Sequence, residues 1–125
     1  MSIIKVDYGS IGGTVKTGTC TIDTSSGRKT VVIDTGISNL SKFILVGAKT
    51  TGNAAYLYWV STDSTKYNAV SNNGGGTGFA VYNALGTAGD ARILCLDSVG
   101  NDGKVTIRGI DNSNWNNMEW TWYAE

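Results

Sequence analysis

Apolar and polar residues alternate along most of the chain, in short runs that turn-forming residues separate. The runs recur about every 8 to 15 residues, a spacing typical of a sandwich or barrel of antiparallel strands. The last run shows the alternation best, because Trp120, Trp122 and Ala124 fall on one face of a strand with period two. The pattern of residues 118–125 therefore predicts a closing strand with one apolar face.

Two segments near the start predict strand neighbours and burial. Residues 18–23 (GTCTID) turn at SSGR into residues 29–35 (KTVVIDT), which indicates a hairpin with Cys20 and Ile22 on one face. Residues 41–49 (SKFILVGAK) are apolar at consecutive positions. We therefore expect them to form a central strand that is covered on both faces.

The middle of the chain predicts another strand pair. The segment AAYLYWVS places Tyr56, Tyr58 and Val60 on one face of a strand and Leu57 and Trp59 on the other. The segment STDSTK then turns the chain into a short return strand at KYNAV. Three consecutive glycines in SNNGGGTG predict a flexible connection to the next strands, FAVYN and ARILCLD.

Residues 98–110 (SVGNDGKVTIRGI) predict the clearest hairpin, because Asn101, Asp102 and Gly103 tolerate the positive φ of a tight turn. Beyond the turn, Val105 and Ile107 share one face of the returning strand. With no proline in the chain, we predict an all-β domain, an antiparallel β-sandwich of the jelly-roll or lectin-like kind with eight or nine strands. Up-and-down and Greek-key orders both stay open. Residues 1–125 are expected to form one domain, with residues 1–13 as an alternative N-terminal arm.

The composition agrees with strands and tight turns. The chain holds 15 Thr, 11 Ser, 11 Asn and 17 Gly, and its charged share of 16% is below the roughly 25% of ordinary soluble domains. Ten basic and ten acidic residues cancel, so the basic excess that a nucleic-acid partner requires is missing. No apolar run reaches the roughly 18 residues of a membrane helix. The start of the chain lacks the pattern of a signal peptide.

Candidate chemistry is sparse in this sequence. Histidine is absent, which removes the commonest general base and metal ligand. The aspartates are expected to serve turns through bonds to their own backbone, the alternative being a calcium site in DSVGNDG or DNSN. Cys20 and Cys95 are interpreted as two buried free thiols rather than a disulfide. We predict no catalytic residue, no metal and no cofactor. The aspartates expected in turns are Asp63, Asp90, Asp97, Asp102 and Asp111.

The remaining candidates are aromatic residues among neutral polar ones. Amides and hydroxyls match sugar hydroxyls, and an exposed ring can stack on the apolar face of a sugar. Trp115, within DNSNWNN, is the best single candidate. The alternative is that Trp115 is a packing anchor at the sandwich end or in a subunit interface. The predicted sugar-contacting residues are Trp115, Asn114, Asn116, Tyr67, Asn72 and Asn73.

Three stretches together resemble a known kind of module. GTVKTGTCTID, the aromatic centre and MEWTWYAE resemble small β-sandwich modules at the ends of bacteriophage and prophage tail fibres and baseplate appendages. The T-G-T at Thr17, Gly18 and Thr19 and the closing W-x-W-x-A pattern are also similar to the H-type lectin-like domain. The resemblance implies a homotrimer that is part of the virion and that binds cell-surface carbohydrate or forms a rigid tip. The missing histidine and the long glycine-rich loop depart from the lectin pattern, so its sugar site does not transfer residue by residue.

Three functions follow as expectations. The first is a non-catalytic phage receptor-binding module that recognises cell-surface carbohydrate. The second is a purely structural virion module, such as a fibre cap or trimerisation domain, without a ligand of its own. An enzyme is the third, and it rests only on the loops that carry aspartate.

Overall fold

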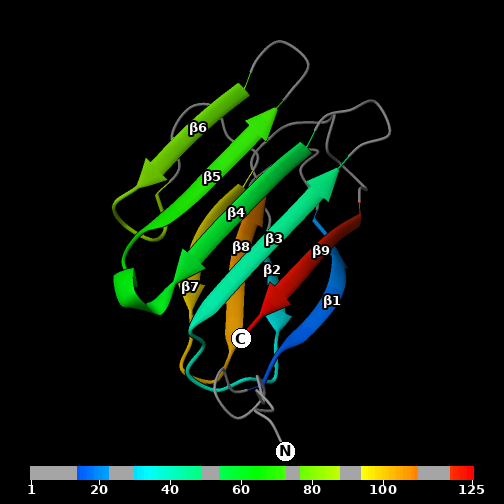
Figure 1. Cartoon of the computed structure of the whole chain (residues 1–125), viewed down its shortest axis with the longest axis vertical. Helices are drawn as coiled ribbons and strands as arrows, with labels where there is room; N and C mark the ends of the chain where they lie inside the picture. Colours follow the sequence, from blue (N-terminus) through cyan, green and yellow to red (C-terminus); the bar gives the residue numbers. More distant parts are fainter. Residues whose placement is uncertain (1–13, 23–29, 49–53, 73–76, 88–93, 110–118) are drawn as a thin grey trace, which may run out of the picture.

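The protein is a β-sandwich of two antiparallel sheets (Figure 1). The computed structural model describes residues 14–22, 30–48, 54–72, 77–87, 94–109 and 119–125. These residues form nine strands and one short 3-10 turn, and none of them lies in an α-helix. The predicted all-β class, antiparallel sandwich and strand number are therefore confirmed. The smaller sheet lies behind the middle strands of the larger one.

The elements follow the predicted runs closely. Their bounds are β1 Lys16–Thr21, β2 Thr30–Asp34, β3 Lys42–Ala48, β4 Ala54–Val60, η1 Ser61–Asp63, β5 Tyr67–Asn72, β6 Thr77–Tyr82, β7 Leu94–Val99, β8 Lys104–Gly109 and β9 Glu119–Ala124. The connection predicted at SNNGGGTG is shorter than expected, because β5 and β6 continue into it from both sides.

The larger sheet has the order β1-β9-β3-β4-β5-β6, and the smaller one has the order β2-β8-β7. Strands β3 to β6 form an up-and-down meander of consecutive neighbours. Strand β9 closes this meander by pairing with β3 on one side and β1 on the other. The order left open by the sequence is thus a meander extended by the pairing of the first and last strands.

The core lies between the two sheets, and alternation selects its members. Phe43 and Leu45 of β3, Leu57 of β4, Leu96 of β7 and Ile107 of β8 have no exposed surface. Each is flanked in its strand by residues of the opposite face, as period two requires. Burial of apolar surface stabilises a fold by about 25 cal/mol per Å². This cluster is therefore the main source of the stability of the sandwich.

The outer face of the larger sheet corrects one expectation. Strand β3 is central, as predicted, but only one of its faces is buried among the described residues. Ile44 and Val46, on the other face, stay partly exposed. The reason is that one sheet can cover only one face of its neighbour, so consecutive apolar residues do not by themselves prove burial on both faces.

The hairpin predicted for the first two strands is wrong. Strand β1 pairs with β9 in the larger sheet, whereas β2 pairs with β8 in the smaller one. Small residues of β1 lie opposite the large indoles of β9, since Gly18 pairs with Trp122 and Cys20 with Trp120. The fit of small residues against large ones therefore favours β9 as the partner of β1. The alternation along residues 18–23 correctly predicted which side chains share a face of the strand. It carried no information about which strand pairs with this one.

The Gly18–Trp122 contact joins the two short motifs that the sequence singled out. A Cβ at position 18 would lie 2.5 Å from Cζ2 of the Trp122 ring, so the indole covers the bare backbone of β1. Trp120 and Ala124, on the same face of β9, are fully buried. The predicted apolar face of the closing strand is confirmed.

Both cysteines are free thiols, as predicted. Cys20 packs against the core, and burial raises the pKa of its thiol to about 11. Cys95 has no exposed surface, and burial raises the pKa of its thiol as well, against the lowering effect of a hydrogen bond from Arg108. Both thiols are therefore protonated at neutral pH.

The close contact at Gly18 yields a stability prediction. Gly18→Ala forces the Trp122 ring to move, and the unfolding free energy is expected to fall by about 1–3 kcal/mol, as for other overpacked sites. Urea unfolding measures the change. Thr17→Ala, on the exposed face of the same strand, serves as the control and should change stability by less than about 0.5 kcal/mol. Equal stability of Gly18→Ala and the wild type would contradict the contact.

The raised pKa of Cys20 yields a pH prediction. The unfolded thiol, with its ordinary pKa of 9.0, ionises before the folded one. The contribution of the protonated Cys20 thiol to the free energy of unfolding is therefore complete below pH 9, and it is lost as the pH rises towards 11. At pH 8, Cys20 in the Cys95→Ala variant should react with Ellman's reagent about 100-fold more slowly in the folded than in the unfolded protein, since the thiolate is the reacting form. Equal rates would contradict the burial of this thiol.

Candidate functional site

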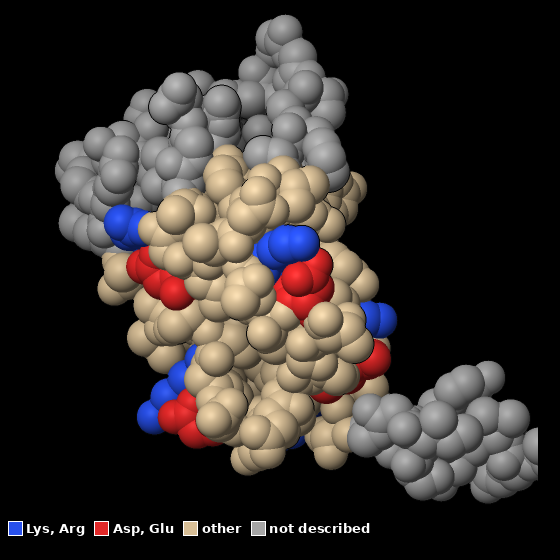
Figure 2. All heavy atoms as spheres, turned by 90° about the vertical axis from the view of Figure 1, so that its left-hand side faces the viewer, with Lys and Arg blue, Asp and Glu red and all other residues tan. Residues whose placement is uncertain are grey.

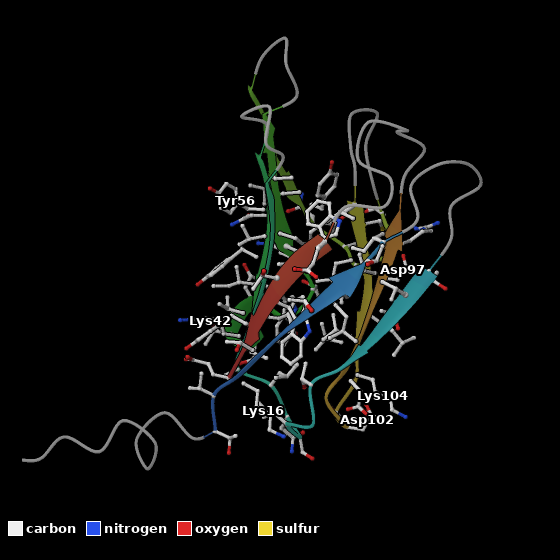
Figure 3. All side chains as sticks on the ribbon, turned by 90° about the vertical axis from the view of Figure 1, so that its right-hand side faces the viewer. Lys16, Lys42, Tyr56, Asp97, Asp102 and Lys104 are labelled. Atoms are coloured by element: carbon white, nitrogen blue, oxygen red, sulfur yellow. The ribbon has the colours of Figure 1, made fainter. Side chains whose placement is uncertain are left out.

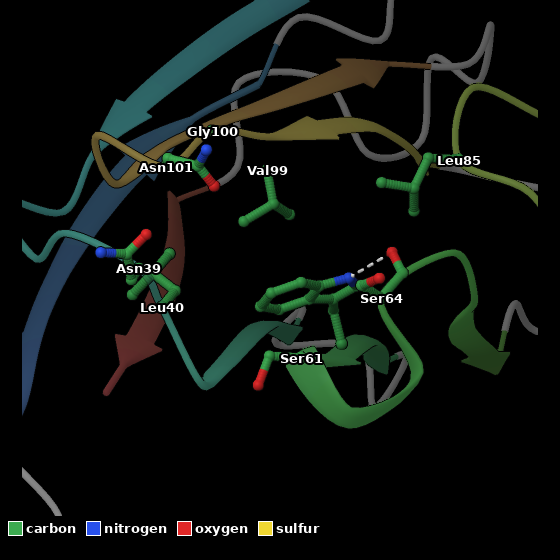
Figure 4. Close-up of a pocket in the computed structure, with 9 residues that line it drawn as sticks. Asn39, Leu40, Ser61, Ser64, Leu85, Val99, Gly100 and Asn101 are labelled. Carbon is green, nitrogen blue, oxygen red and sulfur yellow. Dashed lines mark hydrogen bonds between the residues drawn. The ribbon is translucent and has the colours of Figure 1, made fainter.

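A pocket of about 480 Å³ opens at the end of the sandwich where β4 and β7 finish (Figure 4). This volume falls within the range of small-molecule sites, roughly 300–1,000 Å³. Four stretches of the chain line it, residues 39–40, 59–64, 85 and 99–101, and they include ends of strands from both sheets. The lining residues are Asn39, Leu40, Trp59, Ser61, Ser64, Leu85, Val99, Gly100 and Asn101.

Apolar side chains form the inner part of this pocket. Trp59 and Leu40 are almost fully buried, and Val99 and Leu85 are half-buried. Trp59 lies on the inner face of β4, opposite Phe43, and its indole N–H donates to the carbonyl of Ser64 at 3.0 Å. This bond holds the turn after β4 against the ring and fixes the orientation of the indole.

Neutral polar side chains form the mouth. Asn39, Asn101, Ser61 and Ser64 are all exposed. Asn39 has a left-handed backbone (φ 55°), a conformation that asparagine tolerates better than most residues. The two asparagines lie on adjoining loops, because the backbone N–H of Asn39 donates to the carbonyl of Asn101 at 2.9 Å.

The loops that carry the asparagines are held together by Thr35 and Gly103. The buried Thr35 hydroxyl donates to the Gly103 carbonyl at 2.7 Å and accepts from the Ile37 N–H at 3.2 Å. Gly103 has φ 86°, and a Cβ there would lie 2.2 Å from the Ile37 carbonyl oxygen. Only glycine fits this position, so the β7–β8 turn and the β2–β3 loop are fixed relative to each other.

The predicted hairpin at residues 98–110 is confirmed in this region. Strands β7 and β8 pair across it, and the carboxylate of Asp102 accepts from the Lys104 N–H at 3.1 Å. This is the local backbone bond expected of an aspartate in a turn. Asp63 lies in the short 3-10 turn η1, also as expected.

All nine residues that line the pocket are neutral, which limits its chemistry. Two amides and two hydroxyls supply both donors and acceptors, and the indole and aliphatic groups supply an apolar wall. An ionised ligand would lose its hydration without gaining a counter-charge, which costs several kcal/mol. The pocket therefore favours an uncharged ligand with hydroxyls on one side and C–H groups on the other.

The structure describes few of the site residues predicted from sequence. Trp115, Asn114, Asn116 and Asn73 lie outside the described residues. Asn72 is the last residue of β5, and only its backbone is described. Sugar contact by these residues stays a prediction.

Tyr67 is the one predicted site residue whose side chain is described, and it is buried. Its exposed fraction is 2%, its ring stacks on Tyr82 with centroids 4.7 Å apart, and its hydroxyl donates to the Thr87 carbonyl. Burial raises the pKa of this hydroxyl, and Cys95 and Tyr82 add to the shift. The ring face expected to stack on a sugar is therefore occupied by Tyr82. An alternating pattern cannot reveal this, because the Tyr82 ring that covers Tyr67 comes from the neighbouring strand β6.

A second polar cluster lies on the outer side of the smaller sheet. The Arg108 guanidinium donates to the Asp97 carboxylate at 2.9 Å, to the Cys95 thiol at 3.2 Å and to the Gly86 carbonyl at 2.9 Å. Asp97 was expected in a turn but lies inside β7, where it pairs with Arg108 from the neighbouring strand. The cluster ties the segment around Gly86 to the sheet. A buried, protonated Cys95 thiol is a poor nucleophile, so we assign the cluster a structural role.

Charges elsewhere on the surface are few. On the side that carries the edges of both sheets at β6 and β7, blue and red atoms lie next to each other in small groups on a mostly uncharged surface (Figure 2). Within the described part of the chain, no three potential metal-ligating side chains come together. The same part of the chain holds no helix long and apolar enough to cross a membrane.

Sequence reasoning missed the pocket because its residues come from separated turns. Trp59 was correctly placed on an inner face, which gave it a packing role only. The turn residues Asn39 and Asn101 lie 62 positions apart, as their numbers show, and no local pattern connects them. The available signal was weak: an asparagine beside each of two turns that adjoin apolar strand ends.

Comparisons with known proteins add no relative. No protein-family model matches the chain, and neither a curated protein nor a solved structure matches it. The class of the protein, a two-sheet antiparallel β-sandwich with a neutral pocket at one end, therefore rests on its own geometry.

The Thr35 hydroxyl offers a test of how the pocket loops are held. Thr35→Val removes the hydroxyl that donates to the Gly103 carbonyl, which keeps the Thr35 backbone N–H as a donor, and leaves the Ile37 N–H without this acceptor. The unfolding free energy should therefore fall by about 1–3 kcal/mol. Chemical unfolding measures it. The same substitution at exposed Thr19 should change stability by less than about 0.5 kcal/mol. A neutral effect at Thr35 would show that the loops are held by other contacts.

Proposed function

We propose that this protein is a non-catalytic module that binds carbohydrate, with the end pocket as its binding site. The observation that carries the proposal is the combination of an indole and aliphatic inner wall with a mouth of two amides and two hydroxyls, all uncharged. Neutral sugars present this pair of surfaces, hydroxyls on their edges and C–H groups on their faces. A donor and an acceptor on each asparagine allow paired bonds to neighbouring hydroxyls.

The non-catalytic part of the proposal is supported by the side chains around the pocket. Hydrolysis of a glycosidic bond ordinarily needs two facing carboxyl groups, one to donate a proton and one to act as base or nucleophile. The groups that line this pocket are amides, hydroxyls and apolar side chains, which neither gain nor lose a proton at neutral pH and so cannot act as the acid or the base. This set of residues fits the binding of a saccharide better than the hydrolysis of its glycosidic bond.

The biological setting is proposed from the resemblance in sequence. The motifs around Gly18 and Trp122 resemble phage tail-fibre and baseplate modules, and such a module would be part of the virion and recognise glycans on the host surface. The pairing of Gly18 with Trp122 gives both motifs a structural role. This agrees with the prediction from sequence, in which the sugar-contacting residues lie outside these two motifs.

A second candidate function is a purely structural virion module. The observation that favours it is the partly exposed apolar outer face of the larger sheet, which a rigid assembly would cover. The two functions differ in what they require, because the structural module needs no ligand.

Binding measurements on a glycan array and on whole bacterial cells test the proposal. The wild type should bind a neutral glycan. Asn39→Gly, which removes the amide but suits the left-handed backbone, and Asn101→Ala should each weaken binding about 3- to 10-fold, the loss of one net hydrogen bond. Asn83→Ala, at an exposed asparagine that does not line the pocket, is the matched control and should leave affinity unchanged.

Two results would count against the proposal. Absence of binding to every glycan and to cells would contradict carbohydrate recognition as a whole. Binding that survives both pocket substitutions but is lost in Trp115→Ala would keep the function and move the site from the pocket to Trp115. Trp115→Ala therefore belongs in the same series.

A further inference from the structure

The outer face of the larger sheet carries an unusually apolar surface. Tyr56 and Tyr58 of β4 are 48% and 36% exposed, and Val81 of β6 is 51% exposed. Lys42 and Tyr56 lie on the side of this sheet that points away from the smaller one (Figure 3). The described apolar members of this face, called the outer patch below, are Ile44, Val46, Tyr56, Tyr58, Val60, Val81 and Tyr123.

The face is large enough for a specific protein contact. Six strands give five spacings of about 4.8 Å, and six to seven residues at about 3.3 Å give the other dimension. The area is thus roughly 500 Å² per copy, or roughly 1,000 Å² for two faces in contact, which is the lower limit for a specific interface. Isolated surface residues do not reach this size.

Charged residues lie at the two borders of the patch rather than at its centre. Lys42 Nζ lies 3.7 Å from Glu125 Oε1, and Lys66 Nζ lies 3.5 Å from Asp63 Oδ2. Both pairs sit at the end of the face where β4 finishes, and the exposed Glu119 begins β9 at the other end. The strand centres are uncharged, so a partner needs a neutral apolar surface over the middle of the face.

The same face of a second copy meets this requirement, whereas the other sheet does not. The outer side of the smaller sheet carries Asp34, Asp97, Lys104 and Arg108. Stacking the patch on that side would bury charges against apolar rings, at a cost of several kcal/mol each. Like faces would place the uncharged strand centres of two copies against each other, with the charged residues at the borders of the contact.

We propose that the outer patch is the interface of a homodimer in which the larger sheets of two copies pack face to face. A shallow groove of about 70 Å³ lies on this face; Tyr58, Val60, Tyr67, Asn68 and Val81 line it, together with the ion pair of Asp63 and Lys66 at its border. Tyr56, one of the most exposed rings, lies two residues before Tyr58 in β4. A two-fold axis in the plane of contact, perpendicular to the strands, brings Tyr56 of each copy over the groove of the other.

This arrangement also aligns the strands of the two copies. Face-to-face sheets in proteins keep their strand directions within about 30° of each other, with side chains interdigitating between them. The two-fold axis described reverses the strand direction and keeps the strands aligned. The contact is thus a continuation of the packing that already joins the two sheets of one chain.

Sedimentation equilibrium and light scattering of the whole protein test the dimer. The wild type should contain two copies at micromolar concentration. Tyr56→Lys should raise the dimer dissociation constant at least about 30-fold, the effect of losing an aromatic anchor at an interface. Val81→Lys should weaken the dimer at a second position of the patch.

The matched control is Val32→Lys. Val32 is 55% exposed on the outer side of the smaller sheet, and its substitution should leave the dimer intact. A wild type that stays monomeric at a concentration on the order of 1 mM, where even weak contacts form, would overturn the proposal. So would a three-copy assembly, or a dimer that Tyr56→Lys and Val81→Lys leave unchanged. Circular dichroism confirms that each variant is folded, since all three positions are on the surface.

Discussion

The packing of a three-stranded sheet onto one face of a six-stranded sheet is the constraint on which the rest of this structure depends. It buries the aromatic and aliphatic side chains of the inner faces, including Phe43 and Trp120, without any exposed surface. Because the smaller sheet covers only the inner side, the outer face of the larger sheet remains open. Because the sheets must separate where their strands end, the turns at one end enclose a pocket rather than a core.

The packing of the two sheets determines which side chains line the end pocket and which lie on the outer patch. At the sandwich end, strand termini supply buried apolar groups such as Leu40 and Trp59, while the turns supply Asn39 and Asn101. On the outer face, alternation along β3 and β4 places Ile44, Val46 and the tyrosines in neighbouring rows. The first surface combines amides with an apolar wall and fits a small neutral ligand. The second is flat and apolar, and it fits another protein surface.

The sequence predicted the fold class better than it predicted neighbours. Period two correctly assigned the faces of β4, β8 and β9, because side-chain alternation is a local property of a strand. It failed for the first hairpin, since the partner of β1 is set by the fit of Gly18 and Cys20 against the indoles of a strand about 100 residues later. It failed for Asp97 because a carboxylate inside a strand is tolerated only next to a partner such as Arg108, which no local pattern reveals. The pocket was missed for the same reason, because its members meet only after folding.

The central claim is that the pocket at the end of the sandwich binds a neutral sugar. A two-dimensional NMR titration with neutral saccharides tests it most directly, because the chain has four indole N–H groups that report on different places. The account predicts shifts of the Trp59 indole and of the Asn39 and Asn101 side-chain amides that saturate together, with the Asn83 amide unchanged. Shifts confined to the Trp115 indole, or no saturating shift with any neutral saccharide, would contradict it.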